Sequence, residues 1–187
     1  EPHKHGMLAN PERNVGYPTE LPAGTVPYTR HLAAAGYRCG LVGKWHLGCE
    51  RGQDYYGIEG THLPGWDGPV DHPDYLAYLA ERGLPRYATR DAFRGVFPNG
   101  QASLLMAATY QGPVEGTYSY YLAERAIAML RDMAATRRRE GRPFHLSLHF
   151  FGPHLPYVVP EEYATMYDPA LIARCPSMAE TFCGKPA

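Results

Sequence analysis

Two stretches of the chain follow the same order, in which an amphipathic helix is followed by a glycine, a short apolar strand and a loop that carries histidine. The first stretch predicts a helix over 26–35 and a strand over 37–42, and the second predicts a helix over 118–136 and a strand over 144–150. Strands that alternate with helices are typical of parallel sheets, and ligands bind at the carboxyl ends of such strands. The repeated order therefore predicts an α/β domain whose two histidine loops share one edge.

The strand at 144–150 also carries two histidines within it. His145 and His149 alternate with apolar residues and so lie on one face of the strand. Packing or hydrogen bonding within the sheet is a more common role for such histidines than metal ligation, and we favour it here. Elsewhere, the spacing of apolar residues predicts a helix over 73–82, residues 84–116 read as irregular, and a short helix is expected near 160–166.

Length and charge exclude several classes of protein. A chain of 187 residues corresponds to one domain or a large part of one. Lys plus Arg number 18 and Asp plus Glu 19, a balance that gives no support for a nucleic-acid partner. No apolar run approaches the roughly 20 residues of a membrane-spanning helix.

The cysteines do not form a recognisable metal motif. Cys39, Cys49, Cys175 and Cys183 include no C-x-x-C pair, so a structural zinc site is not expected. Cys175 and Cys183 would be able to close a small loop in an oxidising compartment, but free thiols are the favoured interpretation.

Three residues stand out as candidates for chemistry. Lys44 and His46 follow the first strand and flank Trp45, so in an extended segment both side chains share one face. His154 lies between two prolines directly after the second strand, and these restrict the backbone of its loop. A cation and imidazoles together suit an anionic group and proton transfer. His3 and His5 form a weaker pair, for which a surface loop is the favoured interpretation.

Four segments carry a resemblance to a known family. Residues 36–48 read G-Y-R-C-G-L-V-G-K-W-H-L-G, which resembles the second signature of the type I sulfatases. The P-H-L-P-Y run at 153–157 is similar to a further element of that family, residues 2–7 resemble the segment downstream of its first signature, and 21–36 resemble the approach to the second.

This resemblance implies an alkaline-phosphatase-like α/β fold, with a partial parallel sheet flanked by helices, and hydrolysis of a small-molecule or carbohydrate sulfate ester. It also implies a formylglycine nucleophile made by a maturing enzyme, and a divalent cation, commonly calcium. By motif, Lys44 would contact the formylglycine and a sulfate oxygen, and His46 would assist collapse of the intermediate. His154 would bind sulfate and protonate the leaving alkoxide.

The sequence also departs from the family. No cysteine or serine stands in the nucleophile motif C/S-x-P-x-R, and the aspartate pairs that hold the metal have no counterpart. We therefore expect residues 1–187 to be a single partial catalytic domain, truncated at both ends, with no metal ligands and no activity alone. A related phosphonate or phosphodiester hydrolase, or a non-catalytic binding module, are the alternatives, and the Lys44-Trp45-His46 run favours a sulfatase.

The substrate and the location are less constrained. Trp66, His72 and the tyrosine-rich segment 110–121 are candidates to line a pocket, although packing is the expected role for most of them. Export is typical of many sulfatases, but nothing in these residues assigns a compartment.

Overall fold

The computed structural model describes residues 2–7, 18–48, 50–63, 68–179, 181 and 183–184. The longer helices are α2 (Tyr28–Ala34), α3 (Pro73–Glu81) and α4 (Tyr118–Glu140), and the shorter ones are α1 (Pro2–His5) and α5 (Glu161–Ala164). The strands are β1 (Arg38–Lys44), β2 (Glu59–Leu63), β3 (Thr89–Val96), β4 (Ala102–Tyr110), β5 (Phe144–His149) and β6 (Tyr157–Pro160). Short 3-10 helices are η1 (Gln53–Tyr56), η2 (Val114–Gly116), η3 (Pro169–Leu171) and η4 (Pro176–Ala179). No helix in these ranges is both long and apolar enough to cross a bilayer.

Three strands form a parallel sheet in the order β2-β1-β5. The register pairs Arg38 with Phe144 and Gly43 with His149, so β1 and β5 end side by side. The predicted helices over 26–35, 73–82 and 118–136 and the two predicted strands are all present, within a few residues of the expected bounds. The prediction that these two strands are parallel and belong to one α/β sheet is confirmed, and the structure shows that they are direct neighbours.

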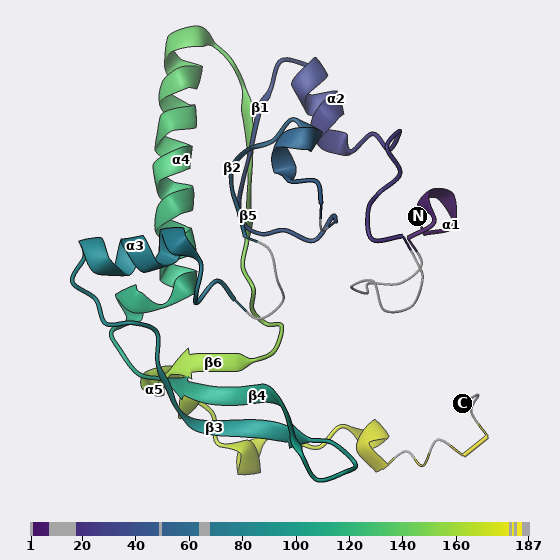
Figure 1. Cartoon of the computed structure of the whole chain (residues 1–187), viewed down its shortest axis with the longest axis vertical. Helices are drawn as coiled ribbons and strands as arrows, with labels where there is room; N and C mark the ends of the chain where they lie inside the picture. The colour runs from purple at the N-terminus through teal and green to yellow at the C-terminus, as the bar shows by residue number, and fades with distance from the viewer. Residues whose placement is uncertain are drawn as a thin grey trace.

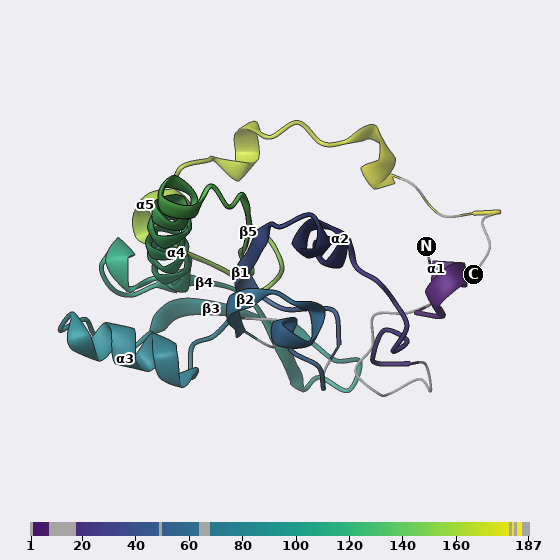
Figure 2. The ribbon, with the colours of Figure 1, turned by 90° about the horizontal axis from the view of Figure 1, so that it is seen from above.

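Helices α4 and α2 cover opposite faces of this sheet, as Figures 1 and 2 show. Gly40 of β1 abuts α4 so closely that an added Cβ would lie 2.5 Å from the terminal methyl carbons of Met129 and Met133. On the other face, the Cys39 thiol donates to the Thr29 carbonyl oxygen of α2 at 3.7 Å. Alternate residues of β1 therefore face the two helices in turn.

A second sheet has the strand order β3-β4-β6 and lies below the end of β5 in the view of Figure 1. Its β3 and β4 are antiparallel, and β4 and β6 are parallel. The prediction that residues 84–116 are irregular was therefore wrong. The physical reason is that β3 includes charged residues and shifts register against β4, while β4 is rich in alanine, so neither shows the alternation typical of a strand. The pairing of the two strands defines them.

The main core lies between the α4 face of the parallel sheet, α3 and the start of α4. Its buried side chains include Leu63, Tyr75, Tyr121, Leu122 and Val42. A smaller cluster on the opposite face contains Leu41, Trp45, Tyr56 and Ile58. These two clusters hold β1 from both sides, which fixes where its carboxyl end points.

Candidate functional site

The candidate site begins where β1 ends, at a close approach between two strands. Gly43 has φ of +112°, and a Cβ at this position would lie 2.0 Å from the His149 carbonyl oxygen on β5. Only glycine accommodates both the backbone conformation and the approach. Gly43 therefore lets β1 and β5 run together up to the candidate residues Lys44 and His46.

Lys44 leaves the strand on the face of the main core. Val42 packs into that core, and Lys44, two residues on, continues the same face. Its Nζ lies 5.6 Å from the centre of the Phe151 ring, at the edge of the core, and the side chain is partly buried. The ammonium group thus stands at the carboxyl edge of the parallel sheet, as the sequence predicts.

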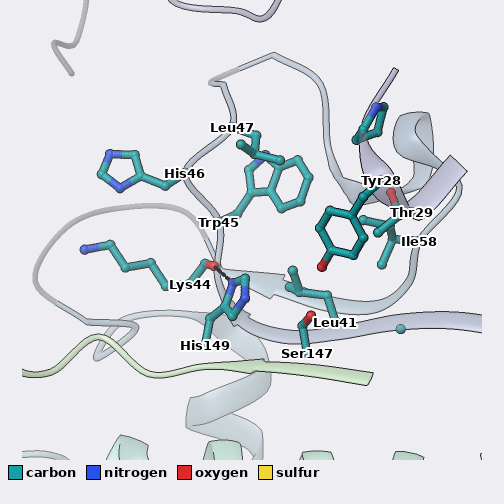
Figure 3. Close-up of a pocket in the computed structure, with 12 residues that line it drawn as sticks. Tyr28, Thr29, Leu41, Lys44, Trp45, His46, Leu47, Ile58, Ser147 and His149 are labelled. Carbon is teal, nitrogen blue, oxygen red and sulfur yellow. Dashed lines mark hydrogen bonds between the residues drawn. The ribbon is translucent and has the colours of Figure 1, made fainter. Parts of the chain in front are cut away.

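Trp45 anchors the loop that carries the two predicted basic residues. Its backbone N–H donates to Leu63 at 3.0 Å, its indole N–H donates to the Arg51 carbonyl oxygen at 3.1 Å, and its side chain is only 6% exposed. Figure 3 shows Lys44 and His46 on one side of this loop and Trp45 on the other. The structure therefore brings Lys44 and His46 together, as the alternation predicts.

His149 holds the same loop from β5. Its Nδ1 lies 3.2 Å from the Lys44 carbonyl oxygen (Figure 3). Because a carbonyl oxygen only accepts, Nδ1 is the donor. His145 lies on the same face of β5, where its Nε2 contacts the Tyr28 hydroxyl and the Ser147 hydroxyl at 3.1 Å each. Hydrogen bonding, the role favoured for both histidines, is what the structure shows.

His154 lies in the turn that follows β5. Its backbone N–H donates to the Phe151 carbonyl oxygen at 3.1 Å, and its Nδ1 donates to the Leu155 carbonyl oxygen at 2.8 Å. The side chain is exposed. Through Phe151 the turn is linked to Lys44, although His154 does not line the cavity beside that loop.

That cavity has a volume of about 320 Å³, and Lys44 and His46 line it together with Trp45. Its walls include Tyr28, Leu41, Trp45, Ile58 and His149. In Figure 3 the Lys44 and His46 side chains extend away from Tyr28 and Ile58, although all four residues line the same cavity. Size and lining are ordinary for a small-molecule pocket.

Other residues considered from sequence have structural roles or lie elsewhere. His3 and His5 belong to α1, which lies apart from β1 in both views (Figures 1 and 2). His72 accepts a hydrogen bond from the Asp74 N–H at the start of α3. Tyr110, Tyr118 and Tyr121 are buried, and the last two pack in the main core. Trp66 and Cys49 lie outside the described residues.

The cysteines described are free thiols. Burial raises the pKa of Cys39, which makes its thiol a poor nucleophile. Within the described ranges, no group of three or more His, Cys, Asp or Glu side chains is placed to hold a metal ion. The described residues therefore do not fit the cation that the resemblance implies.

Sequence reasoning overlooked Phe151 as part of this site. It is 3% exposed and touches Lys44 through its ring and His154 through its carbonyl oxygen. Its place two residues before the Pro-His-Leu-Pro run was a signal, but an apolar residue after an apolar strand is ordinarily assigned to packing.

Comparisons with known proteins point to one family. The family model described as Sulfatase matches residues 1–171. An uncharacterized sulfatase, YidJ, of Escherichia coli K12 is 29% identical over 140 residues, which are 74% of this chain and 24% of that protein. Arylsulfatase A of Bos taurus is 27% identical, with 73% and 26% covered, and arylsulfatase G of Canis lupus familiaris is 31% identical with the same coverage.

A solved structure shares the fold. It is described as the crystal structure of Ps i-CgsB in complex with k-i-k-neocarrahexaose, and it superposes with a TM-score of 0.53 at 19% identity, over 92% of this chain and 36% of that one. The chain spans about a quarter of the length of the curated relatives it matches. The Sulfatase model, matching nearly the whole chain, shows that this chain belongs to the sulfatase family.

Proposed function

We propose that residues 1–187 form part of a single catalytic domain that hydrolyses sulfate esters, and that Lys44, His46 and His154 contact the sulfate group. The observation that carries this proposal is the placement of Lys44 and His46 on one side of an anchored loop at the carboxyl end of β1 (Figure 3). The adjacent end of β5 leads into the turn of His154.

The chemistry suits these side chains. A sulfate group that loses its ester bond gains negative charge on its oxygens, and a fixed ammonium group stabilises that charge. Lys44 supplies this charge at the sheet edge. An imidazole can give a proton to a leaving alkoxide, the role proposed for His154, or hold a proton at the nucleophile, the role proposed for His46.

The nucleophile and the cation are proposed for a longer protein, the parent, of which residues 1–187 would be one part. The family resemblance implies a formylglycine, produced by a maturing enzyme, and calcium. A motif for the nucleophile is not present in residues 1–187, and neither are the aspartate pairs for the cation. We propose that a longer parent supplies both, and that the chain alone does not turn over sulfate esters. Its coverage of about a quarter of its relatives supports this proposal.

The substrate is proposed as a small-molecule or carbohydrate sulfate. Two of the relatives are named arylsulfatases, which makes an aryl sulfate a reasonable first probe. The test compares residues 1–187 with an extended parent, each expressed with a formylglycine-generating system and calcium. We expect turnover from the parent only. Comparable turnover by residues 1–187 would contradict the assignment of the nucleophile to the parent.

Sulfate binding tests the site in this chain directly. The ring signals of His46 and His154 should shift when sodium sulfate is added in an NMR titration. Lys44→Met should abolish those shifts, whereas Lys4→Met, which removes a lysine of α1, should not. Equal effects of the two variants would refute the site. A stronger response to phosphate than to sulfate would favour the phosphodiester hydrolase alternative.

A further inference from the structure

We propose that Phe151 is a positioning residue for Lys44, holding its ammonium group at the place where sulfate binds; this inference rests on the proposed function. The Nζ of Lys44 lies 5.6 Å from the centre of the Phe151 ring, within the roughly 6 Å over which a cation is attracted to an aromatic face. Phe151 does not itself offer a polar side-chain atom to sulfate, so it acts through Lys44.

The Phe151 ring is held firmly enough to act in this way. Its side chain is 3% exposed and belongs to the main core. The Tyr118 ring lies against it edge-on, with the ring centres 5.9 Å apart and the planes at 77°. Buried side chains in a packed core occupy one rotamer, so the face presented to Lys44 is fixed in direction.

Strand register explains why these two residues meet. Gly40, Val42 and Lys44 follow one another on the α4 face of β1. The core on that face extends past the end of β5 to Phe151. The Lys44 side chain therefore leaves the strand on the face of the core, and its charged end reaches the Phe151 ring.

The backbone of Lys44 is held as well. His149 donates from Nδ1 to the Lys44 carbonyl oxygen at 3.2 Å, and Gly43 lies against the His149 carbonyl. The lysine is thus fixed at its carbonyl by β5 and at its ammonium group by Phe151. A side chain with four rotatable bonds loses less freedom on binding an anion when it is already held.

Phe151 also links the second candidate residue to this arrangement. Its carbonyl oxygen accepts the His154 N–H at 3.1 Å, which begins the turn after β5. One buried residue, Phe151, therefore contacts both the Lys44 ammonium group and the turn that carries His154. Replacing its ring while keeping an apolar side chain should disturb Lys44 and leave the backbone hydrogen bond to His154 in place.

The contact can be measured without any activity. The chain has three lysines, Lys4, Lys44 and Lys185, so reductive methylation with ¹³C-formaldehyde labels few positions and keeps their charge. An aromatic face shifts the methyl protons above it upfield. We expect the Lys44 signal of the wild type to lie upfield of the other two, and Phe151→Leu to return it to their position. A wild-type Lys44 signal that coincides with those of Lys4 and Lys185 would overturn the proposal, and this measurement needs no variant to fold.

Sulfate affinity tests the consequence. Sodium sulfate titrated into unlabelled protein should bind Phe151→Leu about tenfold more weakly than the wild type, which corresponds to about 1.4 kcal/mol. The control is Phe97→Leu, since Phe97 is 51% exposed beyond β3. Unchanged affinity in a folded Phe151→Leu, or an equal loss in the Phe97 control, would overturn the positioning role. A wild type that shows the upfield signal but binds no sulfate would instead refute the proposed function, and the contact would then have no sulfate to position.

Discussion

Replacing Gly43 by alanine tests whether the close approach of β1 and β5 is what allows the site to form. Gly43 has φ of +112°, and the added Cβ would lie 2.0 Å from the His149 carbonyl oxygen, whereas real Cβ contacts essentially never fall under 3.0 Å. That oxygen belongs to the backbone at the end of β5 and cannot rotate away as a side chain would. The two strands must therefore separate at the point where Lys44 emerges.

The matched control is Gly141→Ala at the end of α4. Gly141 has φ of +71°, and its added Cβ meets nothing within 4 Å. A non-glycine residue in the left-handed region costs about 1–2 kcal/mol, so Gly141→Ala should lower the free energy of unfolding by about that amount. Gly43→Ala bears a similar conformational cost and also disrupts hydrogen bonds between strands, each of which costs about 1–3 kcal/mol when a buried group loses its partner. With one such hydrogen bond lost, we expect a total of about 2–5 kcal/mol.

Urea unfolding followed by far-UV circular dichroism measures both variants. A domain of this size is ordinarily stable by about 5–15 kcal/mol, so the Gly43→Ala loss is a large share and its midpoint should fall well below that of the control. If the two variants lose the same free energy within about 0.5 kcal/mol, the close approach is not what requires glycine. The backbone conformation alone would then account for both losses.

Two further predictions concern the core and the thiols. The Met133 side chain is 0% exposed and packs against Gly40, so Met133→Ala should lower the free energy of unfolding by about 2–5 kcal/mol. The control, Ile127→Ala on the exposed side of α4, should change that free energy by about 0.5 kcal/mol. Equal losses of the two variants in urea unfolding would refute the packing described. Burial raises the pKa of Cys39, and a hydrogen bond from Ser177 lowers the pKa of the exposed Cys175, so Cys175 forms the thiolate at lower pH. Iodoacetamide at pH 8 should therefore alkylate Cys175 before Cys39 in the folded chain, as mass spectrometry would show, and faster alkylation of Cys39 would contradict its burial.

The regular units of this protein were visible in its sequence because local and tertiary preferences agree there. The helix at 118–136 has apolar residues at helical spacing, and the structure buries them against β1 and β5. The strand at 144–150 alternates, and the structure places His145 and His149 on one face. Where one face must be buried, the pattern of apolar residues indicates both the element and its orientation.

The hairpin of β3 and β4 lacked such agreement. Its exposed apolar residues include Phe93, Val96 and Leu104, so burial does not impose a clear alternation on it. Register shifts along the pair further blur the period. β3 is defined by its pairing with β4, and β4 also pairs with β6, whose residues lie about 50 positions away along the chain.

The sequence by itself determined which residues emerge at the ends of the two parallel strands. An amphipathic helix precedes each of β1 and β5, which identifies the two strands. Past the end of β1, successive side chains of an extended segment point to opposite sides, which separates Lys44 and His46 from Trp45. Only the tertiary structure decided what holds Lys44. The Phe151 ring and the His149 imidazole lie more than 100 residues further along the chain, and they reach Lys44 because the parallel pairing of β1 and β5 sets Gly43 beside His149. A contact of that kind depends on strand register, which the spacing of residues in either strand alone does not specify.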